Sequence, residues 1–279
     1  MNAQLDAVRS HRVSGPVAPG VSLRRVTRSE LTKLLSVRSS LLTLSGAWIA
    51  MVGIGVLVAR LGADSQLKNP DSSYDPTGNA LVGSMLAILA VAVLGVLVIS
   101  AEYSSGMIRN SMSAVPARLP VLWAKAIVVT VSTFVAMASA SIVAFLLGQL
   151  VTSGLHYSNG SSLTVGLGDP GVFRAVIGCA LSMTLVAVIA LGLGTALRST
   201  AAGISASLGL LLVAPAIVSF IPGSIGKLNK YLPSDAGSAM WAVHRSSGSL
   251  SPGAATAVLA GWSVAALLVA AIMLRKRDV

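Results

Sequence analysis

Residues 102–125 read EYSSGMIRNSMSAVPARLPVLWAK, a polar and basic stretch that separates two long apolar runs, 76–101 and 126–155. Two prolines interrupt it, and three basic residues outnumber its one acidic residue. Irregular polar backbone cannot lie in lipid, because its N–H and C=O groups would have no partners there. We therefore expect the stretch to emerge into water between two membrane-spanning helices. Its excess of Lys and Arg indicates the cytoplasmic side.

The composition predicts an integral membrane protein. Of the 279 residues, 54% are hydrophobic and 10% are charged, and the mean hydropathy is +0.82. A soluble domain would carry about a quarter charged residues. The formal net charge is +11, but the basic residues gather at the ends of apolar segments, so we expect no binding of nucleic acid. The one cysteine, Cys179, lies in an apolar run and supports neither an internal disulfide nor a metal site.

The apolar segments predict an all-α protein with six transmembrane helices, each near the ~20 residues needed to cross a bilayer. They are residues 42–61, 79–100, 122–151, 172–197, 202–221 and 253–274. The turn at 198–200 is so short that the fourth and fifth helices must be antiparallel neighbours. Pro215 lies inside the fifth segment, which we expect to kink there or to end early.

The distribution of basic residues predicts that both chain ends are cytoplasmic. With six spans, 14 Lys or Arg fall on the inner side and 6 on the outer side, whereas 4 acidic residues fall inside and 5 outside. Short cytoplasmic loops carry the excess of basic residues. The closing Arg275–Arg277 also favours a cytoplasmic C-terminus. We expect a multi-pass protein of the cell membrane.

The region before the first span is expected to have two parts. Residues 1–22 are rich in Gly and Pro and predict a disordered cytoplasmic tail. Residues 23–41 predict an amphipathic helix in the membrane surface, with Thr27 and Glu30 at capping-box spacing. The alternative is a basic flank that simply continues the first span. Residues 42–279 would form the six-helix membrane domain.

The third outer loop, residues 222–252, differs from the other outer loops because its middle, 236–243, is apolar. It predicts either a short helix or re-entrant element that caps the outer end, or a mobile surface loop. Composition alone does not separate these two possibilities.

Motifs for chemistry are missing from the sequence. We find no catalytic constellation, and no GxxxxGK[ST] with which to bind ATP. The middles of the spans hold no Asp, Glu, Lys or Arg, which disfavours a proton- or ion-coupled carrier. Small residues recur at spacings of three or four in the spans and predict close helix packing, Gly178, Ser182 and Gly203 among them.

The sequence resembles the permease subunits of ABC-2 type transporters, in the form common in actinobacteria. The resemblance covers nearly the whole length and rests on four stretches: RSELTKLLSVRSSLLTL (28–44), AEYSSGMIRNSMSAVPARLPVLWAKAIV (101–128), AAGISASLGLLLVAPAIV (201–218) and YLPSDAGSAMW (231–241). The second stretch is the most specific.

This resemblance implies a six-helix half-transporter with an N-terminal connecting helix and a cytoplasmic coupling helix between helices two and three. The coupling helix would dock on a separate ABC ATPase subunit, and two permeases, identical or different, would assemble with two ATPases. By the resemblance, the coupling region holds Glu102, Gly106, Ile108 and Arg109, and the connecting helix holds Glu30 and Lys33. ATP and Mg would be bound by the partner, with no cofactor in this chain.

We therefore expect a non-catalytic transmembrane subunit, an exporter component driven by a separate ATPase. The alternatives are a secondary carrier, or a membrane anchor or sensor that transports nothing. For Glu102 two roles are open. Its carboxylate contacts the ATPase, or it binds a basic side chain or backbone amide of this same chain.

Overall fold

The computed structural model describes residues 23–69, 74–104, 118–156, 162–221, 226–244 and 246–276. Within these ranges the regular structure is helical, apart from an isolated β-bridge between His156 and Ser162. The described residues form six helical segments long and apolar enough to cross a membrane, which confirms the predicted number: Arg38–Lys68, Pro76–Tyr103, Leu119–Thr152, Val172–Leu197, Thr200–Ser219 and Pro252–Lys276.

The first helix, α2 (Leu23–Ser36), is separate from α3 (Arg38–Lys68) because Val37 between them has extended backbone, with φ −85° and ψ 112°. The predicted capping box is wrong. The helix starts four residues before Thr27, whose hydroxyl donates to the carbonyl oxygen of Leu23 inside the helix. The Glu30 side chain is buried and faces the helices beside α2.

The second and third spans flank residues 105–117, which lie outside the described residues. The second span comprises α4 (Pro76–Leu81) and α5 (Ser84–Ser104), and the third is α7 (Arg118–Thr152). The polar stretch was expected to run to residue 125, but its last part, 118–125, is already helical. Pro120 allows this, because it lies in the first turn of α7, where its missing N–H breaks no helical hydrogen bond.

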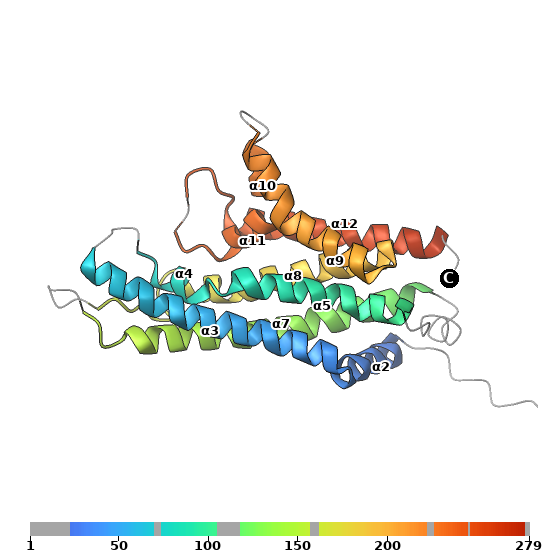
Figure 1. Ribbon diagram of the computed structural model, residues 1–279, viewed down its shortest axis with the longest axis horizontal. Helices are drawn as coiled ribbons and strands as arrows, with labels where there is room; N and C mark the ends of the chain where they lie inside the picture. The colour runs from blue at the N-terminus through green and yellow to red at the C-terminus, as the bar shows by residue number, and fades with distance from the viewer. Residues whose placement is uncertain are drawn as a thin grey trace, which may run out of the picture.

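The central helix is α8 (Val172–Leu197), the most buried of the six spans, which packs against α5, α7 and α12 (Pro252–Lys276). Figure 1 shows these helices running side by side along the long axis of the molecule. Glycines allow the closest approaches. A Cβ atom at Gly95 would lie 2.2 Å from the carbonyl oxygen of Ala187, so α5 and α8 touch through backbone at this crossing.

The fifth span follows the tight turn as predicted. Arg198 adopts a left-handed conformation (φ 54°) and ends α8, and the Ser199 side chain accepts from the backbone N–H of Ala202 to begin α9 (Thr200–Leu208). The span continues as a π-helical turn η1 (Gly209–Val213) and α10 (Ala214–Ser219). The kink expected at Pro215 is confirmed, because α10 turns away from the bundle (Figure 1) and buries none of its residues. A proline ring clashes with the carbonyl four residues earlier, and a widened turn relieves that clash.

The loop predicted to be the third outer one contains a 3₁₀ turn, η2 (Gly226–Tyr231), and a short helix, α11 (Pro233–Trp241). The small and apolar residues of α11 are buried against α8 and α12, namely Pro233, Ala236, Gly237, Ala239 and Met240. Of the two alternatives for this loop, the short helix is confirmed for residues 233–241, and a wholly mobile loop is wrong. The apolar middle of the loop is the buried face of α11.

The helices define two ends of the bundle. At one end lie α2, the end of α5, the start of α7 and the end of α12 (Figure 1). We call this the α2 end, and the other, where α11 packs, the α11 end. The first and last described helices therefore begin and end, respectively, at the same end of the bundle.

The α5–α8 crossing yields a stability prediction. Gly95→Ala should lower the free energy of unfolding by about 1–3 kcal/mol, because the new methyl group forces the two backbones apart. Gly261→Ala in α12 is the matched control, since nothing lies within 4 Å of its added Cβ atom. Thermal unfolding of the purified proteins measures both. A Gly95→Ala protein as stable as the control would contradict the close crossing.

Candidate functional site

Four charged side chains from three helices meet at the α2 end. Glu30 and Lys33 come from α2, Glu102 from the last turns of α5, and Lys125 from the second turn of α7. The Lys125 side chain is 1% exposed, and both glutamates are buried. The two elements that flank residues 105–117 are thus joined to α2 through charge. We call this group the four-charge cluster.

Each lysine of the cluster bridges both glutamates. The Lys125 Nζ atom donates to Glu30 Oε2 at 2.5 Å and to Glu102 Oε1 at 2.9 Å. It also donates to the carbonyl oxygen of Val98 at 3.3 Å. The Lys33 Nζ atom lies 2.6 Å from Glu30 Oε1 and 3.0 Å from Glu102 Oε1. Two positive and two negative charges therefore share one site with no net charge.

The ion pairs between the lysines and glutamates offset the cost of removing these charges from water. Removing an ion from water costs several kcal/mol, and only good geometry with further hydrogen bonds offsets that cost. Lys125 meets this requirement, since three oxygen atoms surround its ammonium group. Loss of one partner would leave a buried charge uncompensated, which destabilises a protein by about 3–5 kcal/mol. The cluster therefore resists separation of α2 from α5 and α7.

The pKa values of the α2 pair respond to this environment. Burial acts to raise the pKa of Glu30, but the ammonium groups of Lys125 and Lys33 outweigh it, so this pKa is lowered. Burial acts to lower the pKa of Lys33, but the carboxylates of Glu30 and Glu102 outweigh it, so this pKa is raised. Their stabilising contribution is lost as the pH falls through the lowered pKa or rises through the raised one. Both groups remain charged at neutral pH.

The structure brings together three of the residues predicted to form the site. Glu30 and Lys33 of the expected connecting helix bind Glu102 of the expected coupling region, directly or through Lys125. Glu102 thus takes the second of its two predicted roles, a bond to basic residues of its own chain. The other coupling residues lie outside the described residues: Gly106, Ile108 and Arg109.

Lys125 is the cluster residue that was missing from the predicted site. It had been counted as the last residue of the polar stretch (102–125) and also fell within the third predicted span (122–151), but its burial was not predicted. It lies seven residues inside α7 and is buried. A usable signal was present, because VLWAKAIVV sets one lysine among apolar residues. A lysine inside an apolar helix requires a negative partner. Glu30 and Glu102 were two of the four acidic residues expected on the same side.

A cavity of about 280 Å³ lies beside the cluster, between α2, α3 and α5. Its walls are largely apolar, and the four charged residues line one part of it: Glu30, Lys33, Glu102 and Lys125. The balanced charges give this cavity no net preference for an anion or a cation.

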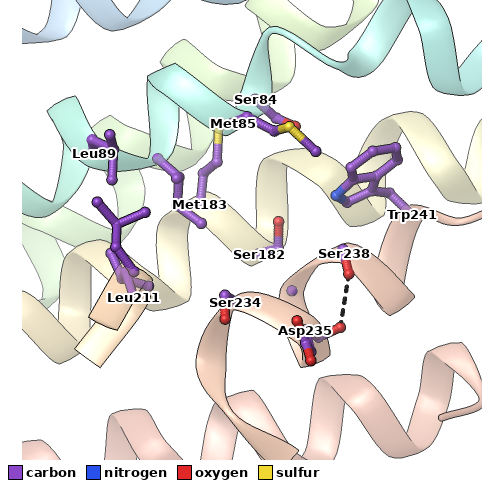
Figure 2. Close-up of a pocket in the computed structure, with 13 residues that line it drawn as sticks. Ser84, Met85, Leu89, Ser182, Met183, Leu211, Ser234, Asp235, Ser238 and Trp241 are labelled. Atoms are coloured by element: carbon purple, nitrogen blue, oxygen red, sulfur yellow. Dashed lines mark hydrogen bonds between the residues drawn. The ribbon is translucent and has the colours of Figure 1, made fainter. Parts of the chain in front are cut away.

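A second cavity, of about 300 Å³, lies beneath α11 between α5, α8 and η1 (Figure 2). Leu89, Met183 and Leu211 gather at one end of the view, and Trp241 lies at the other. Ser182 is on α8, and Asp235 is on α11. The sequence did not single out these residues as a site, because they come from four separate segments.

The Arg174 side chain binds the C-terminal end of α11, the helix that covers this cavity. From the first turn of α8, its guanidinium nitrogens donate to the carbonyl oxygens of Met240 and Ala242, both at 2.9 Å. Those carbonyls belong to the C-terminus of α11, where backbone acceptors lack partners within the helix. A Cβ atom at Gly178 would come 2.7 Å from the Met240 oxygen, so the missing side chain lets α11 sit against α8.

The fold and these two sites define a class of protein: a helical chain with six membrane-length helices, compatible with a multi-pass membrane protein. In the described part of the chain, no three His, Cys, Asp or Glu side chains are grouped so as to hold a metal ion. No known family model matches the sequence, and no curated protein matches it.

The cluster yields a second prediction. Lys125→Met should lower the free energy of unfolding by about 3–5 kcal/mol, because two buried carboxylates lose their shared cation. Adding Glu102→Gln should recover part of this loss, since Lys33 then balances Glu30 alone. Thermal unfolding of Lys125→Met, Glu102→Gln and the double variant forms a double-mutant cycle, which measures the interaction between the two residues. Strictly additive effects would show that the two residues do not interact.

Proposed function

We propose that this chain is the permease subunit of an ATP-driven exporter of the ABC-2 type, powered by a separate ATPase subunit. The observation that carries the proposal is the four-charge cluster, which ties α2 to the two helices flanking residues 105–117. The sequence resemblance assigns the ATPase contact to that segment and the connecting helix to α2. Both chain ends are proposed to be cytoplasmic, with the chain in the cell membrane.

The cluster gives such an ATPase a means to move the membrane helices. A force on α2, or on the segment between α5 and α7, would move α2, α5 and α7 together, because separating their buried ion pairs costs several kcal/mol. ATP binding and hydrolysis in the partner would then bias the bundle between two packings. The chain needs no nucleotide site of its own for this.

The role of Glu102 changes within this proposal. Its carboxylate oxygen Oε1 accepts from both lysines. We therefore assign it to positioning the helices, and we leave the direct ATPase contact to Gly106, Ile108 and Arg109. The partners would be two ATPase subunits and a second permease, identical or different, in the lipid bilayer. A secondary carrier and a non-transporting anchor remain the competing functions.

The contact with the ATPase has a direct test. Arg109→Ala should reach the membrane at normal levels but retain less of a P-loop ATPase during purification, and show lower ATP turnover in reconstituted vesicles. The matched control is Lys276→Ala, which removes an exposed charge from the last turn of α12 at the same end. Arg109 is not one of the four residues of the cluster, whereas a Glu102 substitution would remove one of the cluster's charges.

The competing functions predict other results. If the purified native protein retains no P-loop ATPase and vesicles show no ATP-dependent export, the proposal fails. If an ATPase is retained equally by Arg109→Ala and the control, the coupling assignment fails while the transporter class survives.

The orientation is tested by cysteine labelling. In a Cys179→Ser background, cysteines at Ser162 and Ser247 should react with a membrane-impermeant thiol reagent on intact cells, and one at Ser29 should not. All three positions are exposed, and the Ser29 position lies in α2. Labelling at Ser29 without labelling at the other two would reverse the proposed orientation.

A further inference from the structure

Among the described residues that line the cavity beneath α11, Asp235 is the only ionisable one. The others carry hydroxyl, sulfur, apolar or aromatic side chains, with Ser182, Ser234, Met85, Met183 and Trp241 among them. The volume, about 300 Å³, is near the lower end of the range of small-molecule sites, about 300–1,000 Å³. An apolar pocket with a few polar groups is the usual form of such a site.

Two polar side chains of this cavity, Asp235 and Ser234, have no hydrogen-bond partner among the described residues, whereas the Ser182 and Ser238 hydroxyls donate to backbone oxygens. In the part of the chain that the structure describes, no hydrogen bond or ion pair reaches the carboxylate of Asp235; the Ser238 hydroxyl bonds to its backbone oxygen instead (Figure 2). The Ser234 hydroxyl oxygen is buried without a hydrogen-bond partner. Burial raises the pKa of Asp235, the response of a carboxyl group withdrawn from water without a cation beside it. Among the described residues of α11, no other group forms a hydrogen bond with the Asp235 carboxylate or the Ser234 hydroxyl.

The surrounding residues select among ligands. A carboxylate with partial burial favours a cation and opposes an anion, and the indole ring of Trp241 also favours positive charge. Met85, Met183 and Leu211 form an apolar surface that a fully hydrated inorganic cation would not use. A ligand with an ammonium group and a short apolar body fits both parts.

We propose that the cavity beneath α11 binds an amphipathic organic cation, with its ammonium group at Asp235 and Ser234 and its apolar part against Met85, Met183 and Leu211. Binding by the isolated chain is independent of the function proposed above. That this ligand is the exported cargo rests on that function.

Asp235 also has a purely local explanation. It lies in the first turn of α11, where a negative charge stabilises the helix. This explanation accounts for an acidic residue at that position but gives the chain no preference among ligands. A measured preference for a cationic over a neutral ligand therefore distinguishes a binding role of Asp235 from a role in stabilising α11 alone.

The test uses three probes that differ in one group: 4-phenylbutylamine, which is an ammonium ion at pH 7, 4-phenylbutanol, and 4-phenylbutyrate. Isothermal titration calorimetry on the full chain in lipid nanodiscs, with empty nanodiscs subtracted, measures each affinity. We expect the ammonium ion to bind about tenfold more tightly than the alcohol, a difference of about 1.4 kcal/mol. The carboxylate should show no binding. Equal affinity for the amine and the alcohol, or no binding of the amine, would overturn the proposal.

Asp235→Asn should abolish the preference for the ammonium ion and leave binding of the alcohol unchanged, and Asp235→Glu should keep the preference. Asp64→Asn is the matched control, since it makes the same change of charge on α3, on a residue that pairs with Arg60 and does not line the cavity. An Asp235→Asn protein that retains the preference would contradict the site. If that variant fails to fold, the three probes on the unmodified chain still decide. The ATPase experiments are separate, so failure of either proposal is recognised independently.

Discussion

The burial of the Lys125 ammonium group is the constraint on which the α2 end of this structure depends. A lysine two turns inside an apolar helix cannot be left without negative charge. Glu102 is 23 residues away in sequence, and Glu30 is 95 residues away. Because both carboxylates must reach one nitrogen atom, the positions of α2, α5 and α7 are set together. Lys33 then completes the balance of charge from the exposed side.

The two ends of the bundle are held by different kinds of interaction. At the α2 end, ion pairs join helices through long side chains. At the α11 end, glycine and alanine allow backbone contact, and Arg174 bonds to main-chain oxygens. Ion pairs at the α2 end make three helices one body, whereas α11 is attached chiefly by small-residue packing and one arginine.

The helix α5 connects these ends. Its first half lines the cavity beneath α11, and its second half lines the cavity beside the four-charge cluster and carries Glu102. The same helix crosses α8 at Gly95, where backbone meets backbone. An axial shift of α5 would alter the walls of both cavities at once. If both proposals hold, α5 links the end assigned to the ATPase with the cavity proposed to bind a ligand.

The sequence by itself determined the number and positions of the spans, the tight turn at 198–200 and the kink at Pro215. These features depend on local properties: the length of an apolar run, the number of residues in a turn, and the ring of proline. It also indicated Glu30, Lys33 and Glu102 as site residues, through a family resemblance. It left Lys125 in both the polar stretch and the third span, because a lysine beside a polar stretch looks the same whether it ends a loop or enters a helix.

Only the tertiary structure decided which charges meet and how residues 226–244 are arranged. Glu30 has capping-box spacing from Thr27, yet Thr27 lies inside α2 and not at its N-cap, and the Glu30 carboxylate binds two lysines instead. The apolar residues of 236–243 were compatible with a helix or a mobile loop until α8 and α12 supplied a surface to bury them. Both outcomes depend on partners far away in the sequence, and no local pattern carries that information.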